Sequence, residues 1–271
     1  MSREQPQGPP EPVVDFQVRD WPKQDLLIDA RGADVRHFGP QQVTNDDNIP
    51  DPVDAFVAAA RLGMPTRPTV APWDSSAKVM ERHIAAGDGV AQYRIEINNL
   101  DPGALRVLTN LLRARNLTAA TIRSAATERI ARESPAGATG STDAALATLP
   151  YPLHFKPTDF RVDYEEPVHT HKDRAIQLLF TNPPDVAQEE ASYAGLAAWT
   201  MLLMLGAYPG DDQPPAQSGA APDAPFLFDD RTIELAFPEL FLCDELCFDA
   251  LINWVQLFHH STATVDTLII R

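Results

Sequence analysis

The chain has 271 residues, with 22 Lys and Arg against 38 Asp and Glu, and a formal net charge of -16 at pH 7. This length can bury a substantial core in one large domain or two ordinary ones, and we expect two related halves. The charge argues against nucleic acid as a partner, because binding to phosphates depends on Lys and Arg. An anionic membrane surface is disfavoured for the same reason, whereas a basic protein is a suitable partner.

Residues 1–20 are rich in proline and charge and predict a flexible tail. This segment lacks the apolar core of a secretory signal, and the longest apolar window, residues 194–208, is too short to cross a bilayer. We therefore expect a cytoplasmic protein. The two cysteines, Cys243 and Cys247, share an apolar helical face, which predicts core packing and excludes a disulfide framework.

The first half, residues 21–133, contains local signals for both helices and strands. Asp51 followed by Pro52 is typical of a helix start, with the carboxylate as N-cap and the proline in the first turn. A second helix is expected over residues 74–87, because apolar residues recur there at helical spacing. The alternation of apolar and polar residues over 93–97 predicts a half-buried strand.

A helix starting after Asp101 and a strand over residues 117–122 complete the first half. Residues 134–150 are rich in Pro, Ala, Gly and Ser and predict a flexible linker. The second half, residues 151–271, begins with two strands that we expect to pair with each other, over 160–164 and 175–180.

A long helix is expected over residues 186–207, opened by Asp185, and it is followed by an exposed loop over residues 210–225. The final stretch predicts a strand, a helix and a strand, because the helix carries an unbroken apolar stripe over residues 243–258. Its layout matches the strand, helix and strand around residues 93–122. The prediction is a mixed α+β fold of two strand-helix-strand halves, with helices on one face of each sheet, in a duplicated ferredoxin-like or split βαβ layout.

Charge is distributed unevenly between these two similar stretches. Residues 94–132 hold seven basic and three acidic residues, whereas residues 200–271 hold eleven acidic residues and two arginines. Such a surface suits a basic partner, because complementary charge steers association and fixes its register. The expected partner-binding residues are Asp229, Asp230, Glu234, Asp244, Glu245 and Asp249.

The sequence contains no Gly-rich phosphate loop, nucleophile elbow or zinc-protease helix, and we expect no cofactor. Our first hypothesis is therefore a non-enzymatic interaction protein that binds a basic protein, such as an immunity or inhibitor protein. A structural or regulatory module that assembles into a homo-oligomer is an alternative.

A metal-dependent enzyme is a further alternative. In an extended segment His169 and His171 would point to the same side, as two ligands of a divalent metal require. Glu165 or Glu166 would then complete the site or act as a general base. The interpretation without a functional role is a polar strand edge with solvated imidazoles, because the His-x-His pattern is common in proteins.

Overall fold

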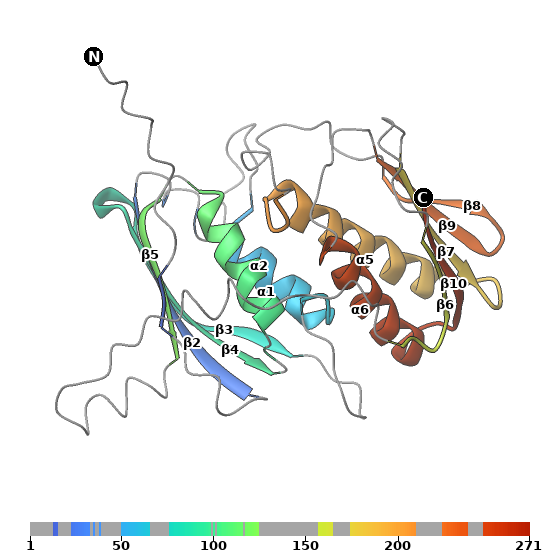
Figure 1. Cartoon of the computed structure of the whole chain (residues 1–271), viewed down its shortest axis with the longest axis horizontal. Coiled ribbons are helices and arrows are strands. Elements are labelled where there is room, and N and C mark those ends of the chain that lie inside the picture. Colours follow the sequence, from blue (N-terminus) through green and yellow to red (C-terminus); the bar gives the residue numbers. More distant parts are fainter. Residues whose placement is uncertain are drawn as a thin grey trace, which may run out of the picture. The chain divides into compact units, whose positions relative to one another are not determined.

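A computed structural model (Figure 1) describes residues 13–15, 23–32, 35, 38, 50–65, 76–98, 100, 102–115, 117–124, 157–164, 174–209, 224–237 and 246–271. Its contacts divide the chain into two compact units. Unit 1 comprises Met1–Val57 and Ala77–Pro150, and unit 2 comprises Ala58–Ser76 and Tyr151–Arg271.

Unit 1 contains a five-stranded sheet in the order β1-β5-β2-β4-β3. β1 runs parallel to β5, and the other neighbours are antiparallel. The elements are β1 (Val13–Asp15), β2 (Lys23–Gly32), α1 (Pro52–Arg61), β3 (Ala77–Ala85), the short 3-10 helix η2 (Ala86–Asp88), β4 (Val90–Asn98), α2 (Pro102–Arg113) and β5 (Leu117–Ser124). The division between the units falls within α1, whose residues 52–57 belong to unit 1. β1 lies within residues 1–20, which were expected to form a flexible tail. These three residues instead form an edge strand that pairs with β5.

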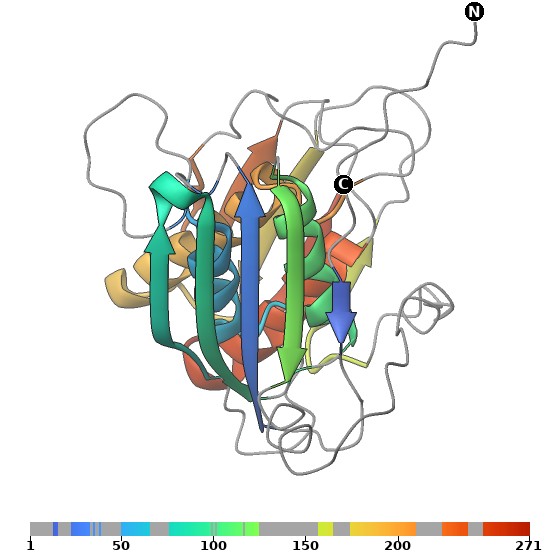
Figure 2. The same ribbon diagram turned by 90° about the vertical axis from the view of Figure 1, so that its left-hand side faces the viewer.

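The alternation predicted over residues 93–97 is found in β4, where it separates a buried face of the sheet from an open one. Buried apolar side chains on β2 and β4 face the helices, and they are Leu26, Ile28, Ala30, Ala91, Tyr93, Ile95 and Ile97. None of the helices that the structure describes lies on the opposite face, which is seen from the front in Figure 2. There Arg94 pairs with Asp25 across the strands at 2.7 Å, and Gln92 donates to Asp29 at 2.9 Å. This polar face is typical of an antiparallel sheet that is solvated on one side.

The predicted start of α1 is confirmed. The Asp51 carboxylate accepts a hydrogen bond from the backbone N–H of Val53 at 2.8 Å, which satisfies a donor of the first helical turn. The phenolic O–H of the buried Tyr93 donates to the other oxygen of Asp51 at 2.5 Å. Burial, followed by the charge of Asp51, raises the pKa of Tyr93, so the tyrosine stays neutral.

The helix predicted over residues 74–87 is wrong, because β3 occupies most of that stretch. The apolar residues Ala77, Met80 and Ile84 recur at helical spacing, but Ala77 is buried whereas Met80 is 46% exposed, so they do not form one buried stripe. The register of β3 against β4 shifts between Val79 and Glu81, so the intervening Met80 breaks the two-residue alternation. The bulge therefore interrupts the two-residue alternation by which this strand could have been recognised in the sequence.

Unit 2 repeats this arrangement with a five-stranded sheet in the order β6-β10-β7-β9-β8. β6 runs parallel to β10, and the other neighbours are antiparallel. The elements are β6 (Arg161–Tyr164), β7 (Arg174–Phe180), α5 (Val186–Met204), β8 (Phe226–Asp229), β9 (Thr232–Phe237), α6 (Leu246–Ser261) and β10 (Val265–Ile270). The expected pairing of the first two strands with each other is wrong, because β10 lies between β6 and β7.

The two helices of unit 2 pack closely on one face of its sheet (Figure 1). A side chain cannot be added at Gly195 of α5 without a clash, since a Cβ there would lie 2.0 Å from the ring of Trp254 on α6. The indole N–H of Trp199 donates to the backbone carbonyl of Cys247 at 2.7 Å. Cys247 is buried, as predicted, whereas Cys243 lies outside the described residues.

The two units share one topology. Each sheet begins with a short strand parallel to its last strand, and the remaining elements follow the order β-α-β-β-α-β, which is consistent with the predicted ferredoxin-like layout. The predicted α+β class with two similar halves is confirmed. The order and direction of the described strands agree between the units, which is consistent with a duplicated layout.

Candidate functional site

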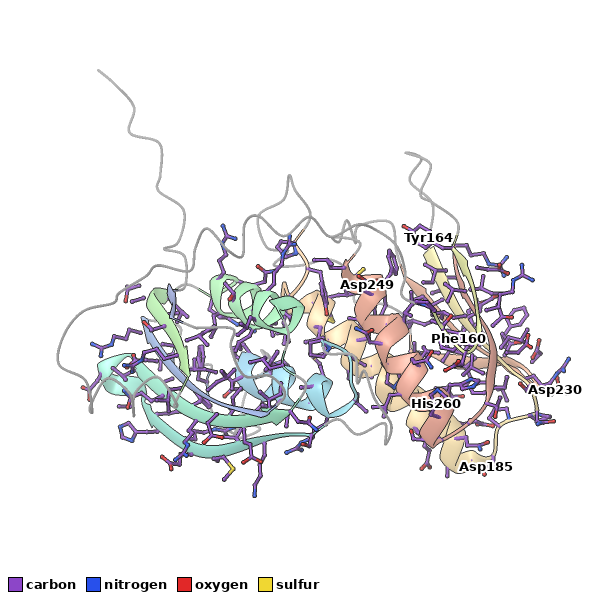
Figure 3. All side chains as sticks on the ribbon, turned by 60° about the horizontal axis from the view of Figure 1, so that its bottom comes forward. Phe160, Tyr164, Asp185, Asp230, Asp249 and His260 are labelled. Carbon is purple, nitrogen blue, oxygen red and sulfur yellow. The ribbon has the colours of Figure 1, made fainter. Side chains whose placement is uncertain are left out.

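The hairpin of β8 and β9 brings together three of the six acidic residues expected to bind a partner. Asp229 ends β8, Asp230 lies in the turn, and Glu234 lies on β9. Asp249 lies instead on α6, in the helix layer and away from the hairpin (Figure 3). Asp244 and Glu245 lie outside the described residues. The candidate site is therefore the hairpin, residues 226–237.

Asp229 holds the turn of this hairpin. Its carboxylate accepts a hydrogen bond from the backbone N–H of Arg231 at 2.8 Å. This backbone bond, followed by a side-chain hydrogen bond from Thr232, keeps the pKa of Asp229 below its ordinary value. This carboxylate thus uses part of its hydrogen-bonding capacity within the turn and has less of it to offer a partner.

Asp230 points outward from the tip of the hairpin, as Figure 3 shows. Its side chain is 80% exposed, and its carboxylate lies 3.9 Å from the guanidinium of Arg231. An exposed pair at this distance contributes little to stability, because water screens it. Asp230 is therefore well placed to meet a cation from another molecule.

Glu234 has a different environment on the open face of the sheet. The side-chain amide of Gln177 on β7 donates to its carboxylate, and Arg271 in turn donates to the amide oxygen of Gln177 at 2.6 Å. Glu234 is half-buried and Gln177 is buried. This series of bonds joins Arg271, which directly follows β10, to β7 and β9, and it partly balances the charge of Glu234.

The hairpin also carries an exposed apolar strand that the sequence interpretation did not include in the site. Phe226, Leu227 and Phe228 are 43%, 39% and 60% exposed. The rings of Phe226 and Phe228 lie 6.4 Å apart between centroids. Three consecutive apolar residues followed by two aspartates were visible in the sequence. Their exposure was not, because it depends on the position of β8 at the edge of the sheet.

A second polar cluster lies at the end of α6. The carboxylate of Asp159 accepts a hydrogen bond from the amide of Gln256 at 2.6 Å and contacts Nε2 of His260 at 2.8 Å. The bonds from His260 and Gln256 keep the pKa of Asp159 below its ordinary value. His259 accepts from the backbone N–H of Val265 at 3.2 Å, which ties the helix end to β10.

A shallow hollow of about 300 Å³ adjoins this cluster and is lined by residues 182, 183, 188 and 259–264. Ser261 directly follows His260 in the sequence. Its hydroxyl donates to the backbone carbonyl of Leu257 at 2.8 Å, so this hydrogen bond is made within α6. The cluster connects the last turn of α6 to the segment before β6. Its geometry is that of a structural contact at a helix C-terminus.

The alternative metal site cannot be placed, since His169, His171, Glu165 and Glu166 all lie outside the described residues and remain a prediction. Within the ranges that the structure describes, no three His, Cys, Asp or Glu side chains are grouped so as to hold a metal ion. No helix in those ranges is long and apolar enough to cross a membrane.

Comparisons with protein-family models, with curated proteins and with solved structures gave no match. Function therefore has to be inferred from the geometry of the chain itself.

Proposed function

We propose that this protein is a non-enzymatic interaction protein that binds a basic protein through the hairpin of β8 and β9. The observation that carries the proposal is the 80% exposed carboxylate of Asp230 at the hairpin tip, directly after an exposed apolar strand. An interface commonly combines an apolar centre with a charged rim, and rim charges set the rate and selectivity of association. An inhibitor or immunity protein for a basic enzyme is one class that would use such a surface.

The formal net charge of -16 supports the same conclusion. It would attract a basic partner over a distance of roughly 10 Å at ordinary salt, and contacts near Asp230 would then fix the orientation. Asp229 adds negative charge near the tip and Glu234 adds it farther along the hairpin, opposite Phe226, although each also serves a contact within unit 2.

The test is capture of partner proteins from the source cell with a charge-reversal variant, Asp230→Lys. The matched control is Asp88→Lys, which changes the net charge equally at an exposed residue of unit 1. We expect the unaltered protein and the control to capture the same basic protein, with less capture at high ionic strength. Asp230→Lys should lose most of that capture.

The recovered protein is then purified and titrated against all three forms. Equal affinity for Asp230→Lys and Asp88→Lys would contradict the proposal, because charge at the hairpin tip would then have no particular role. Absence of any basic partner at low ionic strength would contradict it as well.

A further inference from the structure

β8 is the outermost strand of the sheet in unit 2. It pairs with β9 on one side, with Phe226 opposite Glu234 and Leu227 opposite Ile233. No described strand pairs with its other side. The backbone groups on that side are a template for an added strand, since a strand edge presents unused N–H and C=O groups.

The side chains of β8 add apolar surface to this edge. Six large hydrophobic side chains are exposed in the described part of the chain, and three of them are consecutive on β8. All four residues of this strand are exposed, so neither the helices nor the neighbouring strand covers it. Exposed apolar residues that are contiguous in this way mark interaction sites more often than isolated ones do.

The equivalent strand of unit 1 provides an internal control. β3 occupies the same edge position as β8, but Lys78, Glu81 and Arg82 interrupt its apolar residues. Arg82 forms an ion pair with Asp54 and lies over the ring of Tyr93, 5.3 Å from its centroid. Charged side chains and a bulge are the usual protection of an edge strand against pairing with another chain.

β8 lacks charge over Phe226–Phe228, and its first charged residue is Asp229, at its end. Its pairing with β9 also contains a register shift, between Leu227 and Asp229. Both edge strands thus contain a bulge. They differ in their charged residues, which interrupt the apolar residues of β3 but not those of β8. An edge strand with no charge among its exposed apolar residues, next to exposed carboxylates, fits a binding strand better than a strand selected only to stay soluble.

We propose that β8 binds an extended segment of the basic partner as an additional strand of the sheet. This inference rests on the proposed function and specifies how the partner binds. Main-chain hydrogen bonds along β8 would provide affinity, as in other cases of strand addition. Apolar side chains of the incoming segment would pack on Phe226 and Phe228, and a lysine or arginine beyond them would reach Asp230.

A second copy of this chain is the less suitable occupant. Two copies would each bring a net charge of -16 and the same pair of aspartates to the shared edge. Like charges across an interface oppose association, whereas a basic strand neutralises them. The charge around the edge therefore favours a partner of opposite sign.

The test uses two synthetic ten-residue peptides of alternating valine and lysine as probes. One has an ordinary backbone, and in the other every second amide is N-methylated, which removes donors while keeping the side chains. We expect the ordinary peptide to bind and its N-methylated form to bind about tenfold more weakly or worse, because strand addition depends on main-chain hydrogen bonds. In the complex, amide hydrogen exchange along β8 should slow.

A protein variant provides the second arm, measured with the partner recovered by capture and with the ordinary peptide. Phe228→Lys gives β8 a charge like those of β3 at a side chain that is 60% exposed, so folding should be preserved. We expect about tenfold weaker binding of both ligands. Val186→Lys, at another exposed apolar residue of unit 2, is the control and should bind normally.

The outcomes separate this inference from the proposed function. If Asp230→Lys abolishes capture while Phe228→Lys and N-methylation have no effect, the partner binds the acidic tip and strand addition is wrong. If none of these changes alters binding, both proposals are wrong. A dimer of the unaltered protein that Phe228→Lys dissociates, seen by sedimentation, would overturn the inference in favour of a second copy.

Discussion

β3 and β8 hold the same place in two sheets of the same topology, yet their surfaces are opposites. β3 carries charged residues that form ion pairs with Asp54 and Arg94, whereas β8 exposes three apolar residues in succession. Topology decides which strand lies at an edge, and the side chains decide whether that edge repels or accepts another chain. A difference between two such similar units therefore points to function more directly than the fold does.

The interiors of the two units differ as well. Unit 1 buries a polar contact, in which the Tyr93 hydroxyl donates to the carboxylate that caps α1. In unit 2 the two helices pack closely, with Gly195 against the ring of Trp254, and the indole of Trp199 on α5 donates a buried hydrogen bond to the backbone of α6. The buried bond of unit 1 therefore joins a strand to a helix cap, whereas that of unit 2 joins two closely packed helices.

The largest effect is expected from Gly195→Ala in unit 2. The added methyl group would lie 2.0 Å from Trp254, so the helices must separate or the indole must move. Overpacking of this kind typically costs about 1–3 kcal/mol. Urea unfolding followed by tryptophan fluorescence and by hydrogen exchange in β7 measures the loss.

The control for this substitution is Gly87→Ala in η2, where an added Cβ meets no atom within 4 Å. It should change the free energy of unfolding by less than about 0.5 kcal/mol. Equal stability of the two variants would show that helix packing in unit 2 tolerates a side chain at residue 195. Close packing of α5 against α6 would then not be a source of stability specific to unit 2.

These interior contacts also show what sequence alone can predict. The starts of α1 and α5 were predictable, because Asp51 and Asp185 cap their helices through bonds to residues two and three positions ahead. The closeness of Gly195 to Trp254 was not, since 59 positions separate them and helical periodicity says nothing about which helices meet. Local chemistry specifies where a helix begins, whereas long-range packing specifies its partner.

The candidate site follows the same rule. Composition identified the acidic residues of the hairpin, but it grouped Asp249 with them although that residue lies on α6. Exposure of Phe226 and Phe228 could not be inferred, because an apolar run also suits a buried strand and only the strand order makes β8 an edge. The bulge at Met80 similarly hid the strand character of β3.

An effect of similar size is expected from Tyr93→Phe in unit 1. The substitution keeps the ring packing against Phe38 but leaves the buried Asp51 carboxylate one donor short. Losing a donor to a buried charged group costs about 1–3 kcal/mol. Hydrogen exchange should accelerate in β2 and β4 and remain unchanged in β7 and β10. Equal acceleration in both sheets would mean that the two units unfold as one.

The smallest effect is expected from acidification of the β8–β9 turn. The backbone N–H of Arg231 and then the Thr232 side chain hold the pKa of Asp229 below its ordinary value, so folding favours the ionised form. The resulting stability is present above the unfolded pKa of about 3.9 and is lost as pH falls through the lower folded pKa. Carboxyl NMR shifts should place the midpoint below about 3.9.

Asp229→Asn is the matched variant, because its amide oxygen still accepts the bond from Arg231 but does not titrate in this range. Exchange of the Arg231 amide should accelerate on acidification in the unaltered protein and not in the variant. An identical acid response in both would contradict this role for the carboxylate. Since Asp229 is used by the turn, Asp229→Asn should weaken binding of the basic partner less than Asp230→Asn does. The exposed apolar edge would then lie beside one principal anionic contact, at Asp230.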